Sequence, residues 1–344
     1  MSLYSKEEMV LLSILYARVK KQRYTVPLLN PKALFEMFKQ SLALELSMFD
    51  RKNIDKIARS TNKSLREKNN EELTKEVLRI KMFFSNLNYV NDLDLAINEI
   101  NLAKKYNINI ITYLDNEYPN NLKKISVPPF VLYIKGQIPS EEKLQNSLAI
   151  IGSRNTDEKY GKKVAFNIGN LVKENDWYNI SGLALGCDEY GHKGSLGATG
   201  AIVGQGLALP IYPKENKELS EEMIKNNGFI LSELPPSTRI NPVALIARDR
   251  LQSGISNAIV VIQCSKKSGT LYTVKNALEQ NKKIFVIDYS FDKNIIKSYN
   301  VSGNNELLKK NCSLISNVKI TKEEKERIIG IRNKEELIFY LKDH

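Results

Sequence analysis

The stretch Leu148–Arg154, which reads LAIIGSR, decides the fold class, because a short apolar run ends in glycine, serine and a single arginine. Residues 158–175 follow it with apolar side chains at helical spacing, and the next β-branched run begins at Tyr178. We expect a capping box between Asn155 and Glu158 at the start of this helix. Strand, helix and strand in this order predict one β-α-β unit of a parallel sheet.

The same alternation extends outward from this unit in both directions. Runs of Val and Ile with helices between them are typical of a parallel sheet that is covered on both faces. We therefore predict an α/β fold with a Rossmann-like parallel-sheet sandwich core. The expected strands are Ile108–Leu114, Phe130–Ile134, Leu148–Gly152, Tyr178–Ser181, Ala201–Gly204, Phe229–Leu231, Ala258–Gln263 and Lys283–Asp288.

Glycine marks the boundary of a different region. None of the 17 glycines precedes Gly136, and glycine weakens helix interiors, so its absence favours helices. We expect the helical segment 71–87 to place Leu73, Val77, Leu78, Ile80 and Phe84 on one face. The predicted domains are a helical N-terminal domain over residues 1–106, a Rossmann-like domain over 107–318 and a short helical C-terminal tail over 319–344.

Composition narrows the classes of function. The 344 residues carry a net charge of +12, spread along the whole chain, which is compatible with a polyanionic partner such as nucleic acid and equally with a compositional preference for lysine. Three well-separated cysteines and two histidines predict neither a disulfide scaffold nor a metal cluster. Acidic residues near the start and the lack of a long apolar run predict a cytoplasmic protein without a membrane anchor.

The loops after the predicted strands carry the residues that suit anions. Gly152 allows the backbone to approach a ligand, and Arg154 can bind a phosphate with its two-pronged guanidinium. The alternative is that Gly152 serves a tight turn and that Arg154 is solvated. Lys193 is a candidate phosphate contact, whereas His192 has no evident nucleophile to activate. Neither a Walker A sequence nor a G-x-G-x-x-G fingerprint occurs, so the loops predict neither an NTPase nor a dehydrogenase.

Taken in order, these motifs resemble the DNA-processing protein A family, also called DprA or Smf. They cover residues 107–316 and include Ile-Gly-Ser-Arg, Ser-Gly-Leu-Ala, His-Lys-Gly-Ser-Leu, Ser-Glu-Leu-Pro, Arg-Asp-Arg-Leu, Lys-Ser-Gly-Thr-Leu and Ser-Gly-Asn-Asn-Glu-Leu-Leu. The resemblance implies a Rossmann-like core that binds single-stranded DNA as a homodimer and helps to load a RecA-type recombinase, without a catalytic residue, a cofactor or a metal. The expected nucleic-acid contacts are Gly152, Ser153, Arg154, Ser181, Gly182, Lys193, Arg248, Arg250, Lys267, Ser268, Gly269 and Thr270.

The chain also departs from the family pattern. Asp249 stands where the family usually has Asn between two arginines, and it can pair with Arg248 or Arg250. The N-terminal region lacks the glycines of helix-hairpin-helix turns, and a C-terminal winged helix is missing. The biological setting, whether transformation, general recombination or phage defence, stays open.

Two alternative functions use the same loops. A phosphoribohydrolase-like enzyme needs a carboxylate near the ribose, but Thr270 is followed by no acid before Glu279, which leaves Asp188 and Glu233 as substitutes. A sensor that binds a small nucleotide and signals to the helical region needs only the anion-binding loops. Tyr160, Tyr190, Tyr212 and Tyr272 are candidate stacking residues for the DNA-binding interpretation.

Overall fold

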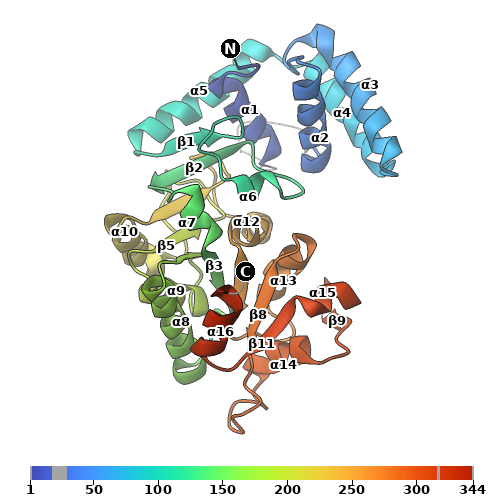
Figure 1. The fold of residues 1–344 in the computed structure, drawn as a ribbon. Helices are drawn as coiled ribbons and strands as arrows, with labels where there is room; N and C mark the ends of the chain where they lie inside the picture. Colours follow the sequence, from blue (N-terminus) through green and yellow to red (C-terminus); the bar gives the residue numbers. More distant parts are fainter. Residues whose placement is uncertain (1, 18–28, 316–317, 343–344) are drawn as a thin grey trace.

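A mixed nine-stranded sheet forms the centre of the molecule, in a computed structural model that describes residues 2–17, 29–315 and 318–342 (Figure 1). The strand order is β1-β2-β6-β5-β4-β3-β7-β8-β11. Every neighbouring pair from β6 to β11 is parallel, whereas β2 pairs antiparallel with β1 and with β6. The strands are β1 Asn109–Thr112, β2 Val131–Gly136, β3 Ser147–Ile151, β4 Tyr178–Ser181, β5 Thr199–Ile202, β6 Phe229–Ser232, β7 Ala258–Val261, β8 Lys283–Ile287 and β11 Ile328–Ile331.

Helices cover both faces of this sheet, because successive strand residues point to opposite sides. In β3, Ile150 packs on the face that α8 and α9 cover, and Ile151 packs on the face that α13 covers. This arrangement confirms the predicted α/β sandwich, with an antiparallel addition at one edge. The covering helices are α6 Asn120–Lys123, α7 Glu141–Gln145, α8 Lys163–Glu174, α9 Cys187–Gly194, α10 Lys217–Lys225, α11 Pro242–Ala247, α12 Asp249–Ile255, α13 Thr270–Glu279 and α14 Ser302–Leu308.

The helices before β1 pack together at one end of the sheet (Figure 1). The first of them begins with a capping box between Ser5 and Glu8. Their apolar side chains share one continuous core with β2 and β6, and the hydroxyls of Ser13 and Tyr133 lie 2.8 Å apart within it. The helical region is therefore joined to the sheet by packing as well as by the chain. Its helices are α1 Lys6–Tyr16, α2 Pro31–Ala43, α3 Arg51–Glu67, α4 Glu72–Ser85 and α5 Tyr89–Lys105.

Two local expectations were wrong. The helix after β3 is capped by Asp157, whose carboxylate accepts from the Tyr160 N–H, and it starts with a π-helical turn, so there is no Asn155–Glu158 capping box. Leu78 is 53% exposed and points away from the apolar face of α4.

The segment 319–344 is not a purely helical tail. It contains α15 Lys322–Glu326 and α16 Lys334–Lys342, but between them β11 pairs in parallel with β8 and extends the main sheet. Ile331 and Leu337 are fully buried, because β11 and α16 add to the core beside Phe285. Before β11, the short strands β9 Leu314–Ile315 and β10 Val318–Lys319 pair antiparallel with each other. Within the described ranges, no helix combines the length and apolar character that crossing a bilayer requires.

Candidate nucleic-acid interface

The strand order places a topological switch point between β3 and β7. From β3 the chain proceeds to β4 through α8 on one face, whereas from β7 it proceeds to β8 through α13 on the other face. The loops after β3 and β7 therefore diverge at the carboxyl edge of the sheet, which is where open α/β sheets bind their ligands. Two of the predicted groups, residues 152–154 and residues 267–270, belong to these two loops.

Gln263 ties the two loops together, and the sequence analysis did not single it out. Its carbonyl oxygen accepts from the Ser153 N–H at 2.7 Å, and its side-chain amide donates to Asp157 Oδ2 at 2.7 Å. The Thr156 hydroxyl donates to the Gln263 amide oxygen. A buried polar residue directly after an apolar strand was the available signal, because such a group needs partners. These bonds fix the loop that presents Arg154.

Gly152 has a packing role in this loop. A Cβ atom at this position would lie 2.5 Å from Cys187 Sγ, so glycine allows α9 to approach the end of β3. Arg154 follows with an exposed side chain. Among the residues that the structure describes, no carboxylate oxygen lies within ion-pair distance of the Arg154 guanidinium. Its charge is thus available to an anion.

The loop after β7 presents a second exposed cation. Asn304 holds this loop, because its amide oxygen accepts from the Cys264 N–H at 2.8 Å and its amide nitrogen donates to the Ile262 carbonyl at 2.9 Å. The Ser268 hydroxyl accepts from the Thr270 N–H at 3.2 Å and shapes the start of α13. Lys267 and Gly269 are exposed. Tyr272, in the first turn of α13, is 46% exposed and offers an aromatic face.

The loop after β4 is used internally. The Ser181 hydroxyl donates to the Ile150 carbonyl at 2.5 Å, and the Gly182 N–H donates to Asp188 Oδ2 at 3.0 Å. Burial raises the pKa of the Asp188 carboxyl. Ser181 and Gly182 thus both have hydrogen-bond partners within the protein, and their expected phosphate contacts stay predictions. Asp188 is not a free acid.

Arg248 is also taken up by the interior and is only 6% exposed. Its Nη1 donates to the Ile202 carbonyl at 3.1 Å, and its Nε lies 3.4 Å from Asp249 Oδ1. The guanidinium fills the space beside Gly182, where a Cβ atom would lie only 1.6 Å from Nη1. Burial raises the pKa of Asp249 to about 6, although Arg248 opposes this shift. The charge of Arg248 is thus buried, and its expected role as a phosphate contact stays a prediction.

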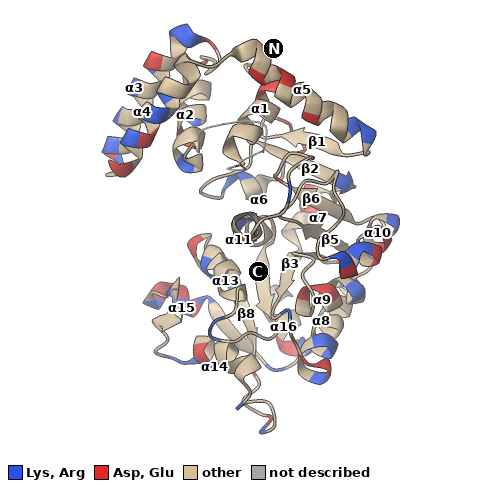
Figure 2. Cartoon of the chain, turned by 180° about the vertical axis from the view of Figure 1, so that it is seen from behind, with Lys and Arg blue, Asp and Glu red and all other residues tan. Residues whose placement is uncertain are grey.

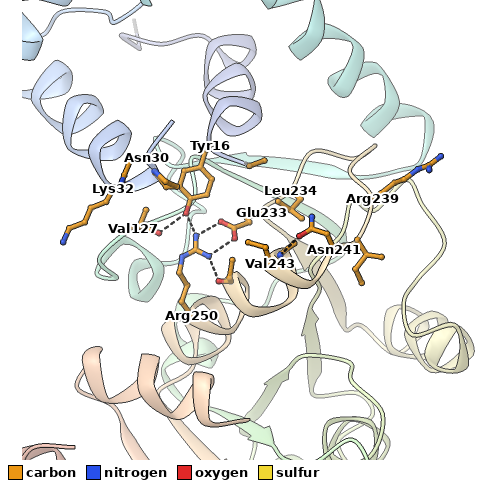
Figure 3. Close-up of a pocket in the computed structure, with 15 residues that line it drawn as sticks. Tyr16, Asn30, Lys32, Val127, Glu233, Leu234, Arg239, Asn241, Val243 and Arg250 are labelled. Carbon is orange, nitrogen blue, oxygen red and sulfur yellow. Dashed lines mark hydrogen bonds and ion pairs between the residues drawn. The ribbon is translucent and has the colours of Figure 1, made fainter. Parts of the chain in front are cut away.

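Arg250 forms a two-pronged ion pair with Glu233 (Figure 3). The two bonds, Nη1 to Oε1 and Nη2 to Oε2, measure 2.7 Å and 2.5 Å, and Nη2 also donates to the hydroxyl of Tyr16 in α1. The pair borders a cavity of about 840 Å³ between α1, α2 and α11. Arg250 thus joins the helical region to the core with its charge paired to Glu233, and its expected contact with DNA stays a prediction.

Lys193 and His192 lie on α9. The Lys193 ammonium is 2.6 Å from Glu189 Oε1 and 4.6 Å from the centre of the Tyr190 ring, so its charge is partly balanced. His192 is fully buried, and its Nδ1 lies 2.7 Å from the Thr199 hydroxyl. Burial lowers the pKa of His192 to about 3, which keeps the ring neutral and fits a packing role.

The twelve expected contacts therefore fall into two groups. Arg154 and Lys267 present exposed charges on the two loops of the switch point, with Ser153, Ser268, Gly269 and Thr270 between or beside them. The remaining side chains are buried, paired or needed for packing. The described part of the chain contains no cluster of His, Cys, Asp and Glu that could hold a metal ion.

Comparisons with known proteins place this core in a family. The sequence profile of DNA recombination-mediator protein A matches residues 109–325. The chain is 36% identical to DNA processing protein DprA of Bacillus subtilis over 186 residues, which is 54% of this chain and 62% of the relative. It is 35% identical to protein Smf of Synechocystis over 191 residues, 54% of this chain and 47% of that protein. The matched part thus spans between about half and two thirds of these relatives.

Two solved structures share the fold. DNA processing protein A from Streptococcus pneumoniae superposes with a TM-score of 0.65 over 98% of both chains, at 20% identity. DNA processing protein A from Helicobacter pylori, whose structure concerns its binding of single-stranded DNA, has a TM-score of 0.56 and 26% identity, and covers 70% of this chain and 99% of that one. The profile match extends over more than half of the residues and includes the strands and loops of the switch point. The chain therefore belongs to the DNA recombination-mediator protein A family.

Proposed function

We propose that this protein binds single-stranded DNA across the carboxyl edge of its parallel sheet, with the backbone phosphates beside Arg154 and Lys267. The observation that carries the proposal is the position of these two exposed cations on the diverging loops of the switch point. Within the described residues neither cation forms an ion pair at contact distance, although Arg154 acts on Asp249 at longer range, and exposed cations of this kind suit a polyanion. The exposed ring of Tyr272 would let a base stack without regard to its identity.

The proposal treats the protein as a binding protein, not as an enzyme. The two acids that could serve N-glycosidic hydrolysis have other partners, because Asp188 accepts from the Gly182 N–H and Glu233 pairs with Arg250. The relative from Helicobacter pylori binds single-stranded DNA, which supports the same ligand here. We extend the proposal to recombination mediation, in which a homodimer on single-stranded DNA helps a RecA-type recombinase to assemble.

Fluorescence anisotropy with a labelled single-stranded oligonucleotide tests the binding site. We expect Arg154→Ala to weaken binding and to reduce the slope of log affinity against log salt by about 0.7, as one lost contact to a single strand predicts. Lys267→Ala should do the same. Lys225→Ala is the matched control, because Lys225 is exposed at the end of α10 and therefore at the opposite edge of the sheet.

Unchanged affinity and slope in both variants would remove the switch point from DNA binding. We would also add mononucleotides to the protein with the oligonucleotide half-bound. Displacement of the oligonucleotide by a mononucleotide at a lower concentration than unlabelled oligonucleotide requires would instead favour the small-nucleotide sensor. Recombinase assembly on a strand coated with a single-strand-binding protein tests the mediator role, with Arg154→Ala as the variant that should be slow.

A further inference from the structure

The helix α3 carries a line of basic side chains that the family match, which begins at residue 109, does not cover. Its residues follow one another at alternating intervals of four and three positions, and each is exposed. At 3.6 residues per turn, such spacing keeps them within about 80° of arc and extends over about 21 Å. We define this basic stripe as Lys52, Lys56, Arg59, Lys63 and Arg66.

The basic stripe faces away from the rest of the protein. The buried residues of α3, among them Ile54, Ile57, Thr61 and Leu65, lie on the opposite side of the helix and pack toward α2 and α4. Figures 1 and 2 place α3 at the outer edge of the helical region. The stripe thus occupies a rigid, outward-facing surface.

The acids of α3 do not neutralise this surface. Asp55 lies beside the stripe, but its carboxylate is 2.5 Å from the ammonium of Lys81 in α4. Glu67 is at the last position of the helix, and Asp50 caps the first turn by accepting from the Lys52 N–H. Within the described residues, no stripe side chain has a carboxylate oxygen at ion-pair distance. These five cations produce a positive potential along α3, which Asp55 reduces near Arg59 and which Glu71 and Glu72 reduce near Arg66.

We propose that the basic stripe of α3 binds the phosphate backbone of duplex DNA, next to the single strand held by the core. This proposal rests on the proposed function, since DNA is the common ligand. A duplex carries about one charge per 1.7 Å of its axis, so it presents a dense line of anions to a line of cations. The stripe has no aromatic side chain, whereas single-strand sites use aromatic rings for stacking. It therefore suits a partner whose bases stay inside the helix.

The experiment uses the full chain and two probes in parallel anisotropy titrations. One probe is a blunt hairpin duplex, and the other is an unstructured single-stranded oligonucleotide. The stripe variant is Lys56→Glu, Arg59→Glu and Lys63→Glu combined, and the neutral version replaces the same three residues with Ala. The charge-matched control is Lys225→Glu, Lys310→Glu and Lys319→Glu combined, since these exposed lysines lie on other elements.

For the wild type we expect salt-dependent duplex binding. The neutral stripe variant should lose about 2 to 3 units of the salt slope for the duplex, as three lost contacts predict, and should keep the single-strand affinity of the wild type. The reversed variant should lose duplex binding altogether, and the control triple should retain most of it. Far-UV circular dichroism and thermal melting establish whether each variant is folded. If the charge-reversed variant does not fold, the neutral variant alone tests the proposal.

Several outcomes would overturn the proposal. These are a wild type that does not bind the duplex at low salt, equal duplex affinity in wild type and both stripe variants, or an equal loss in the control triple. A loss of single-strand binding with duplex binding unchanged would assign the stripe to the single strand. If Arg154→Ala leaves single-strand binding intact while the stripe variants lose the duplex, the proposed core site fails and the stripe stands.

Discussion

Asp249 shows how much the surroundings of one carboxyl decide its chemistry. It lies beside Arg248 and near Asp188, and burial raises its pKa from 3.8 to about 6. A folded-state pKa above the unfolded value means that the folded protein holds the proton more tightly. Stability is therefore lost as the pH rises from about 4 to about 6, by up to about 3 kcal/mol for a shift of this size.

Asp249→Asn removes this titration. We expect the free energy of unfolding of the variant, measured by urea denaturation, to be close to that of the wild type at pH 4. At pH 7 the variant should be the more stable of the two, because the wild type then carries a buried carboxylate. The other titrating groups are common to both proteins and cancel in the comparison. A stability difference that stays constant from pH 4 to pH 7 would show that Asp249 titrates normally.

At the scale of the element, β11 has the clearest energetic role. Ile331 is fully buried in the core, whereas Ile329 in the same strand is only half-buried. We expect Ile331→Ala to lower the free energy of unfolding by about 2–5 kcal/mol, as large-to-small core substitutions do. Ile329→Ala is the matched control and should cost clearly less. Equal, small losses in urea denaturation would mean that β11 is not part of the cooperative sheet.

The contrast between β3 and β11 explains which elements could be predicted. The strand β3 has a short, fully apolar run, a glycine directly after it and an amphipathic helix further on, so its local pattern identifies it. The four residues of β11 stand between charged helical segments, and their partner β8 lies more than 40 residues earlier. Its three isoleucines favour a strand, but the run is short and contains a glycine, and only the tertiary structure places it beside β8 at the edge of the sheet.

The same reasoning applies to the arginines at the candidate site. Arg154 follows a strand in a loop, and its exposure was predictable from that position. The burial of Arg250 depends on Glu233 and on Tyr16, which is 234 positions away in the chain. Distant partners of this kind decide whether a cation is available, and they are set by tertiary packing.

For the whole molecule, the shared core between the helical region and the sheet predicts one unfolding transition. Side chains of α1, α2 and α5 pack in one cluster with β2 and β6, and the Arg250–Glu233 pair reaches Tyr16 across the same boundary. Thermal melting can follow two probes. Trp177, the single tryptophan, precedes β4 and reports on the sheet, while ellipticity at 222 nm reports on all helices. We expect both to give the same midpoint.

An earlier transition in ellipticity, with Trp177 fluorescence unchanged, would contradict this expectation. It would show that the helical region unfolds as a separate unit despite the shared core.

Gly182 and Arg248 also constrain how this protein can evolve. The guanidinium of Arg248 occupies the space that a Cβ atom at position 182 would need, although the two residues are 66 positions apart in sequence. A side chain at 182 requires the Arg248 guanidinium to move, and loss of the arginine removes the positive charge that lowers the pKa of both Asp188 and Asp249. Substitutions at positions 182 and 248 are therefore coupled, and their effects on the free energy of unfolding should not add.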